Sequence, residues 1–317
     1  MTIQELKKKY SSKINPQDLD LLLEFVLKKT RENLLTHPEV KIPLRQLIKL
    51  KYFLRQLQKN KPVNYITGRK EFYGLDFKIN RHTLIPRPET EQIIDLTKKI
   101  IINSLQNNSQ TKFTFIDLGT GSGNIIITLA KYIQGAYFYA SDISRKALAV
   151  AKINTQYHQV NIKFTEGNLL EPFKKLLTTR KTTPIISGCC GNVSAHCSKL
   201  SPADVKKKVL IITANLPYLS TKIYNSTAQN IKDYEPIEAL VSGKDGLNHY
   251  RHLLNQLNTL CKNKKFSFSK VYLLLEISPE QKTKIAQEIE QIFPSAKITL
   301  HKDLAQKWRI VKIKITK

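Results

Sequence analysis

The chain has 317 residues, of which 41% are hydrophobic, and it contains four cysteines. This length allows two domains with a sizeable core, and no apolar run approaches the ~18 residues that a membrane-spanning helix needs. The N-terminal stretch lacks the apolar segment of a secretory signal, so we expect a cytoplasmic protein without a disulfide framework. The net charge of +27 is compatible with a nucleic-acid partner, but it is spread along the whole chain and equally fits a lysine-rich composition.

Two amphipathic helices are predicted near the N-terminus. The first begins at Asn15 and Pro16, a capping residue and a first-turn proline, and its apolar stripe is Leu19, Leu22, Leu23, Val26 and Leu27. The second begins near Pro43, and its expected inner face is Leu44, Leu47, Ile48, Leu54 and Leu57. Such stripes form either an internal core or a partner groove, and we favour the core. Residues 1–62 are therefore expected to form a helical domain.

Residues 63–88 have a different pattern. Gly68 and Gly74 are turn points, and apolar residues alternate with polar ones after Leu75, which predicts a β-hairpin linker. Pro86 and Pro88 stiffen its exit, and the acidic residues after Pro88 suit the first turn of a new helix.

From residue 89 onward, strands and helices alternate, which predicts an α/β fold with a mostly parallel sheet covered on both faces. The expected strands are Phe113–Leu118, Tyr137–Ala140, Ile162–Thr165, Val209–Ala214 and Val271–Ile277. The expected helices are Asn124–Ile133, Ser144–Tyr157, His249–Cys261 and Pro279–Ile292. Two successive strands, Ala296–Leu300 and Arg309–Ile315, close the chain and suggest an antiparallel last strand.

Residues 178–207, about thirty in all, fit no sustained period and are expected to be a surface insertion. This segment contains a cluster of possible metal ligands, Cys189, Cys190, His196 and Cys197. Structural zinc sites use paired ligands at wider spacing, so we favour an insertion over a metal site and expect no metal.

Four strand ends carry residues suited to ligand binding. The first strand runs into a glycine-rich turn, Gly119, Thr120, Gly121, Ser122 and Gly123. This G-x-G-x-G spacing differs from the G-x-G-x-x-G of dinucleotide binders. The second strand ends at Asp142, whose carboxylate can accept both hydroxyls of an adenosine ribose, and the third is followed by Asn168 and Leu169. Since parallel strands present their carboxyl ends at one edge, we expect one binding site there.

The fourth strand ends in the tetrad Asn215, Leu216, Pro217 and Tyr218. One interpretation of this tetrad is a simple turn. The other is a pocket that holds a planar amide-like nitrogen while a group is transferred to it. In that pocket, the Asn215 side-chain oxygen and the Leu216 carbonyl would accept its two N–H donors, Pro217 would fix the turn, and Tyr218 would pack on the amide.

Together these motifs resemble class I methyltransferases that use S-adenosyl-L-methionine. Four further stretches resemble the HemK/PrmC family of protein-(glutamine-N5) methyltransferases: "PVNYITGRKEFYGLDFKINRHTLIPRPETE", "YEPIEALVSGKDGL", "YLLLEISPEQ" and "KDLAQKWRIV". The resemblance implies a Rossmann-like methyltransferase domain over residues 89–317. It also implies S-adenosyl-L-methionine as cofactor, bound by the glycine turn, Asp142, Asn168, Leu169 and Asn215.

The implied reaction is methylation of the glutamine in the Gly-Gly-Gln loop of class 1 peptide chain release factors. The helical domain and the Phe72–Phe77 hairpin would contact the rest of that substrate, and Arg87 would pair with an acidic group there or remain solvated.

Two positions depart from the family pattern: Leu216 replaces a proline, and Asn168 stands where aspartate is common. Because the leucine variant resembles adenine-dimethylating enzymes, an adenine-N6 methyltransferase acting on RNA or DNA is the alternative function. A non-enzymatic binding protein with a methyltransferase fold is the third, and the intact glycine turn, Asp142 and Asn215 count against it.

Overall fold

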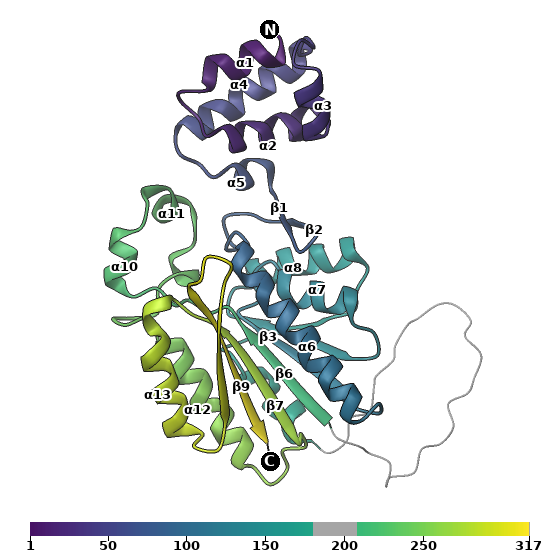
Figure 1. Ribbon diagram of the computed structural model, residues 1–317, viewed down its shortest axis with the longest axis vertical. Helices are drawn as coiled ribbons and strands as arrows, with labels where there is room; N and C mark the ends of the chain where they lie inside the picture. The colour runs from purple at the N-terminus through teal and green to yellow at the C-terminus, as the bar shows by residue number, and fades with distance from the viewer. Residues whose placement is uncertain (180–207, 317) are drawn as a thin grey trace, which may run out of the picture.

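A small helical layer lies above a large mixed sheet in the computed structural model, which describes residues 1–179 and 208–316 (Figure 1). Apart from Thr178 and Thr179, the expected insertion lies outside these residues, and so do the four candidate metal ligands between residues 189 and 197. Within the two described ranges, no helix has both the length and the apolar content that a membrane crossing requires.

The helical layer consists of α1 (Ile3–Tyr10), α2 (Pro16–Leu27), α3 (Arg31–Thr36) and α4 (Leu44–Gln58). As expected, the Asn15 side chain caps α2 by accepting a hydrogen bond from the Gln17 N–H at 2.9 Å. These helices share one apolar core, to which α2 contributes the buried side chains of Leu19, Leu22, Leu23 and Val26.

The expected inner face of α4 was partly wrong. Leu50, Leu54 and Leu57 are buried as one stripe, whereas Leu44 is 72% exposed and Ile48 is 61% exposed. At 3.6 residues per turn, positions 44 and 48 lie on the side of the helix opposite that buried stripe. Tyr52 continues the same exposed side, so α4 presents an apolar stripe to solvent.

The helical layer connects to the sheet through α5 (Val63–Thr67) and an antiparallel hairpin of β1 (Arg69–Phe72) and β2 (Leu75–Lys78). The rings of Phe72 and Phe77 are buried edge-to-face, 6.2 Å between centroids, in a core shared with α6 (Glu91–Asn107). Because these two rings are covered, they are not available for contact with a partner.

The main sheet has seven strands in the order β5-β4-β3-β6-β7-β9-β8. Their bounds are β3 (Lys112–Leu118), β4 (Tyr137–Asp142), β5 (Lys163–Glu166), β6 (Lys208–Ala214), β7 (Lys270–Glu276), β8 (Lys297–Lys302) and β9 (Trp308–Thr316). Strands β3 to β7 are parallel, and β9 runs antiparallel to both β7 and β8. The predicted Rossmann-like sheet with an antiparallel last strand is confirmed.

Helices cover both faces of this sheet (Figure 1). One face carries α6, α7 (Asn124–Tyr132) and α8 (Arg145–His158), and the other carries α9 (Lys174–Thr178), α12 (Asn248–Lys262) and α13 (Lys282–Ile292). The side chains of β3 alternate accordingly, with Phe113 and Phe115 in one core and Ile116 and Leu118 in the other. Two short helices, α10 (Thr221–Ser226) and α11 (Gln229–Tyr234), follow β6 beyond its carboxyl end.

Candidate active site

A cavity of about 410 Å³ lies at the carboxyl ends of β3 to β6, where the sequence predicts a ligand site. Small-molecule sites typically have volumes of roughly 300–1,000 Å³. Of the residues predicted to form the site, eight line this cavity: Gly119, Gly121, Asp142, Asn168, Leu169, Asn215, Leu216 and Pro217. Four others, Thr120, Ser122, Gly123 and Tyr218, do not line it.

The glycine-rich turn contributes Gly119 and Gly121 to the lining of the cavity. Gly119 has φ +65°, and a Cβ atom there would lie 2.9 Å from Cδ2 of Leu216, so a larger residue would collide with the tetrad. Thr120 supports the turn from behind, because its hydroxyl donates to the Asp117 carboxylate at 2.6 Å. Thr213 donates to the other oxygen of Asp117 at 2.7 Å. The buried Asp117 therefore joins β3, the turn and β6.

Asp142 presents its carboxylate at the edge of the cavity. One of its oxygens accepts the Gly121 N–H and the other accepts the Ser144 N–H, both at 2.9 Å. Burial raises the pKa of Asp142, and these backbone donors oppose that rise. Each carboxylate oxygen has more than one lone pair, so Asp142 retains acceptor capacity for a diol.

The loop after β5 is held in a strained backbone shape. Leu169 has φ +55°, which is uncommon for a residue with a side chain, and its carbonyl accepts the Ser141 hydroxyl at 2.9 Å. The Leu170 N–H donates to the Gln256 side-chain oxygen at 2.8 Å, which ties the loop to α12. Glu166, at the end of β5, pairs with Arg145 on the surface and does not line the cavity.

Asn215 sits in the wall of the cavity with its two amide atoms in different surroundings. Its Nδ2 donates to the Thr90 hydroxyl at 3.1 Å. Its Oδ1 is buried and has no hydrogen-bond partner in the described part of the chain. A buried unpartnered acceptor is costly without a ligand, so Asn215 is ready to accept an N–H donor from one.

Tyr218 does not occupy the expected place over the cavity. Its hydroxyl donates to Glu276 Oε1 at 3.2 Å, and its ring packs against the apolar core on the α12 side of the sheet. The other oxygen of Glu276 accepts the Thr90 hydroxyl at 2.6 Å. Burial raises the pKa of Glu276, and the hydrogen bonds from Thr90 and Tyr218 and the charge of Arg309 oppose that rise. The tyrosine is turned inward because a buried carboxylate needs its hydroxyl.

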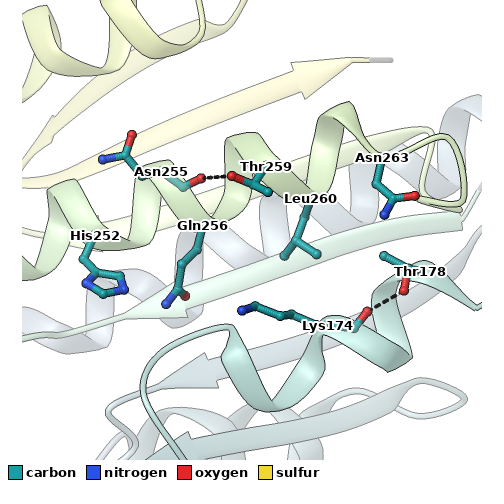
Figure 2. Close-up of a pocket in the computed structure, with 8 residues that line it drawn as sticks. All are labelled: Lys174, Thr178, His252, Asn255, Gln256, Thr259, Leu260 and Asn263. Atoms are coloured by element: carbon teal, nitrogen blue, oxygen red, sulfur yellow. Dashed lines mark hydrogen bonds between the residues drawn. The ribbon is translucent and has the colours of Figure 1, made fainter.

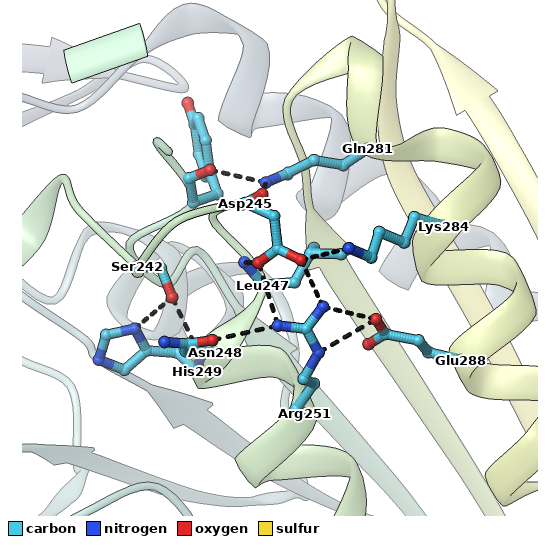
Figure 3. A network of polar contacts seen from close by, with 10 residues as sticks. Ser242, Asp245, Leu247, Asn248, His249, Arg251, Gln281, Lys284 and Glu288 are labelled. Atoms are coloured by element: carbon cyan, nitrogen blue, oxygen red, sulfur yellow. Dashed lines mark hydrogen bonds and ion pairs between the residues drawn. The ribbon is translucent and has the colours of Figure 1, made fainter. Parts of the chain in front are cut away.

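The segment after the tetrad is braced by a polar network (Figure 3). Gln281 Nε2 donates to the Tyr218 carbonyl at 2.7 Å and to the Asp245 carbonyl at 3.0 Å. The Asp245 carboxylate contacts Arg251 and Lys284, and Arg251 also binds Glu288 at 2.7 Å. These hydrogen bonds hold the pKa of Asp245 well below its usual range.

Several lining residues were not predicted from the sequence. The linker contributes His82, Thr83 and Leu84, the segment after α11 contributes Pro236, Glu238 and Ala239, and α12 contributes His249. Two stretches that resemble the family, "LIPRPETE" and "YEPIEALVSGKDGL", contain or border these residues. They could have indicated that the residues are functional, but they did not indicate a role for any of them. The expectation for Arg87 is corrected: its carboxylate partner is Glu235 of the same chain, at 2.6 Å.

A second hollow, of about 600 Å³, lies between α9 and α12 and contains none of the predicted site residues (Figure 2). The hydrogen bonds drawn there stay within single helices, from Thr178 to the Lys174 carbonyl and from Thr259 to the Asn255 carbonyl. Because this hollow contains none of the predicted site residues and the other cavity contains eight of them, we assign the functional site to the cavity beside Asn215.

Known proteins match both parts of the chain. Residues 2–68 match the PrmC N-terminal domain, and residues 109–225 match a methyltransferase domain. The release factor glutamine methyltransferase of Bacillus subtilis is 30% identical over 92% of this chain and 88% of its own length. The corresponding enzyme of Dictyoglomus turgidum is 32% identical over 95% of this chain and 93% of its own length.

Among solved structures, the hMettl16 catalytic domain in complex with the MAT2A 3'UTR hairpin 1 has a TM-score of 0.50 and 15% identity, covering 93% of this chain and 90% of that one. At this identity the likeness concerns the fold alone. The bacterial relatives are similar over both the helical layer and the sheet. The chain therefore belongs to the HemK/PrmC family of release factor glutamine methyltransferases.

Proposed function

We propose that this enzyme transfers the methyl group of S-adenosyl-L-methionine to the side-chain amide nitrogen (N5) of the glutamine in the Gly-Gly-Gln loop of class 1 peptide chain release factors. The observation that carries the proposal is the buried, unpartnered Oδ1 of Asn215 in the wall of the cavity. A primary amide offers two N–H donors, which is what such an acceptor requires. Release factors act on the ribosome, so this substrate implies a cytoplasmic enzyme.

The cofactor would lie along the glycine turn. Gly119 and Gly121 allow close backbone approach, Asp142 would accept the ribose hydroxyls, and Asn168 and Leu169 would contact the adenine. When bound, the cofactor supplies an electrophilic methyl group on a sulfonium. The cavity volume of about 410 Å³ and the acceptor capacity of Asp142 fit a nucleoside of this kind.

The main work of the protein residues is orientation. The lone pair of an amide nitrogen is delocalised into its carbonyl, so the nitrogen must be desolvated and aimed in line with the methyl group. Asn215 Oδ1 and the Leu216 carbonyl would each accept one N–H of the glutamine, and both would stabilise positive charge as it develops. Pro217, the next residue, would fix the turn that follows them. A strong general base is not needed, because the nitrogen becomes more acidic once the new bond forms.

The helical layer would bind the body of the release factor. Leu44, Ile48 and Tyr52 form an exposed apolar stripe on α4, and this stripe is our candidate contact surface. Burial of such side chains against a partner contributes roughly 1.5–3 kcal/mol each at full coverage. The Phe72 and Phe77 rings are excluded from this role by their burial.

The test is incubation with labelled S-adenosyl-L-methionine and a release factor, followed by mapping of the label by mass spectrometry. We expect label on the glutamine of the Gly-Gly-Gln loop and none on a Gln→Ala loop variant. RNA offered in the same reaction tests the adenine-N6 alternative, which family membership does not favour. Label on adenine with an unlabelled release factor would overturn the proposal.

A further inference from the structure

Three polar side chains from distant parts of the sequence form a continuous chain of hydrogen bonds behind the cavity. Asn215 follows β6, Thr90 precedes α6, and Glu276 ends β7. Asn215 Nδ2 donates to Thr90 Oγ1 at 3.1 Å, and Thr90 Oγ1 donates to Glu276 Oε2 at 2.6 Å. Thr90 and Glu276 are buried, so water does not compete for these bonds.

The direction of this chain is set at its Glu276 end. A hydroxyl has one hydrogen, and an ionised carboxylate can only accept. Thr90 must therefore give its hydrogen to Glu276, which leaves only lone pairs facing Asn215. Those lone pairs select the Nδ2 side of the Asn215 amide, which leaves Oδ1 buried and without a hydrogen-bond partner in the described part of the chain. Tyr218 donates to the second carboxylate oxygen, so both oxygens of Glu276 act as acceptors.

We propose that Glu276 is a positioning residue that fixes, through Thr90, which end of the Asn215 amide faces the substrate. This inference rests on the proposed function, in which Asn215 must accept an N–H from the substrate amide. A flipped Asn215 would present its own N–H groups to the N–H donors of the substrate. Donor would face donor, and the substrate nitrogen would lose the contact that stabilises its developing charge.

Protonation of Glu276 would reverse the direction of these hydrogen bonds. A carboxylic acid has one O–H donor, which can donate to Thr90, and Thr90 can then donate to Asn215 Oδ1. The groups that act on the Glu276 carboxyl are Thr90, Tyr218, Arg309 and Glu89, and the Tyr250 hydroxyl binds its main-chain carbonyl. Burial raises the pKa of Glu276, so the reversal occurs at a higher pH than it would for an exposed glutamate.

The experiment compares Glu276→Gln, Thr90→Val and Thr90→Ser in the full chain. Thr90→Val keeps the side-chain shape and removes the hydroxyl, and we expect kcat to fall at least tenfold with little change in cofactor affinity. Thr90→Ser restores a hydroxyl and should recover most of that loss. Thr97→Val is the matched control, since Thr97 is buried and its hydroxyl has no hydrogen-bond partner in the described ranges. A wild-type rate for Thr90→Val would overturn the inference.

Glu276→Gln supplies a readout that a purely structural role would not change. The wild-type kcat should decline as Glu276 takes up a proton at acid pH, and Glu276→Gln should have a lower kcat without that decline. If kcat of Glu276→Gln declines at acid pH as it does in the wild type, the inference is wrong.

A measurement without substrate separates this inference from the proposed function. The Asn215 side-chain amide signals of 15N-labelled protein should shift with pH in the wild type and stay constant in Glu276→Gln and Thr90→Val. If the glutamine is not methylated but the amide signals titrate as expected, the positioning role of Glu276 is supported and the proposed function is wrong. If the glutamine is methylated but the signals do not titrate, the proposed function stands and the positioning role of Glu276 is wrong.

Discussion

Arg87 Nη2 lies 2.6 and 2.7 Å from the two carboxylate oxygens of Glu235, although the residues are 148 positions apart in the sequence. The Glu235 side chain is only 2% exposed, and that of Arg87 is 34% exposed. This ion pair joins the linker to the segment that supplies Pro236, Glu238 and Ala239 to the cavity. It therefore holds together two walls of the site that the sequence places far apart.

Arg87→Ala should destabilise the protein by about 2 kcal/mol, because it leaves a buried carboxylate without its cation. Because Arg87 is partly exposed, the loss in free energy of unfolding should be smaller than for a fully buried ion pair. Urea unfolding of the variant measures this loss. Arg69→Ala is the control, since Arg69 pairs with Asp76 on the surface and its loss should cost less than ~1 kcal/mol. Equal losses in the two variants would contradict the structural role of the Arg87–Glu235 pair.

Asp142→Ala should weaken S-adenosyl-L-methionine binding by about 1–3 kcal/mol, the usual range for hydrogen bonds to a charged group. Calorimetric titration with the cofactor measures this change. Glu166→Ala is the matched control, because Glu166 ends the neighbouring strand but points to Arg145 on the surface. Unchanged affinity in Asp142→Ala, or an equal loss in both variants, would reject the ribose-binding role.

Asp117 should make the stability depend on pH. Burial is the main cause that raises the pKa of Asp117 to about 7, from an ordinary value of 3.8. Between these values the folded protein holds a proton that the unfolded chain has released. The contribution of Asp117 to stability is therefore greatest below pH 4 and is lost as the pH rises toward 7, by at most about 1.4 kcal/mol per pH unit.

Asp117→Asn removes this titration and keeps a polar partner for Thr120 and Thr213. Urea unfolding of both proteins from pH 4.5 to pH 8 should show a flatter curve for the variant below pH 7. Glu276 also has a raised pKa and acts in the same direction in both proteins, so the difference between the curves reports on Asp117. Parallel curves would show that Asp117 is ionised throughout this range.

The strands along the chain, their mostly parallel sheet and the position of the cavity could be predicted from the sequence because they follow from local patterns. The strand that precedes Gly119 and the one that precedes Asn215 are mostly apolar, and parallel topology then brings their carboxyl ends together. The outer face of α4 could not be predicted in the same way. Leu44 and Leu47 are equally apolar, and only the packing of α4 against its neighbours decides which one is covered.

The hydrogen-bond network that joins the tetrad to Thr90 and Glu276 could not be predicted from sequence patterns either. Thr90 and Glu276 are separated by 186 residues, and neither lies in a motif with an evident chemical role. The inward position of Tyr218 depends on that buried carboxylate. The tetrad pattern alone therefore predicts, wrongly, that this ring packs on the substrate amide. Long-range polar contacts of this kind are fixed by the folded sheet and not by local spacing.

The exposed stripe on α4 should contribute to release factor binding. Leu44→Ser combined with Ile48→Ser should raise KM for a whole release factor about tenfold, which corresponds to about 1.4 kcal/mol. The stability should change little, because both side chains are exposed. Steady-state methylation of the intact substrate measures KM. Ile102→Ser is the control, since Ile102 is exposed on α6 in the other domain. An unchanged KM in the double variant would move the docking surface elsewhere.

Substitutions at the first two residues of the tetrad, Asn215 and Leu216, should have different effects. Asn215→Ala removes an acceptor that strengthens as charge develops, so it should reduce the single-turnover rate roughly 10²–10³-fold and affect cofactor binding much less. Leu216→Pro keeps the backbone carbonyl and restores the residue typical of the family, so the rate should be largely retained. Leu216 is only 3% exposed and packs in the core beside Gly119, so this variant should lose about 1–3 kcal/mol of stability.

Single-turnover methylation of a release factor, with cofactor affinity and unfolding measured on the same preparations, separates these effects. The rate loss in Asn215→Ala should persist at saturating cofactor, whereas Leu216→Pro should recover the wild-type rate at temperatures well below its unfolding midpoint. A wild-type rate for Asn215→Ala would remove the side-chain acceptor from the mechanism. A Leu216→Pro variant that stays folded but inactive would show that the backbone at residue 216, and not its carbonyl alone, is specified by leucine in this chain.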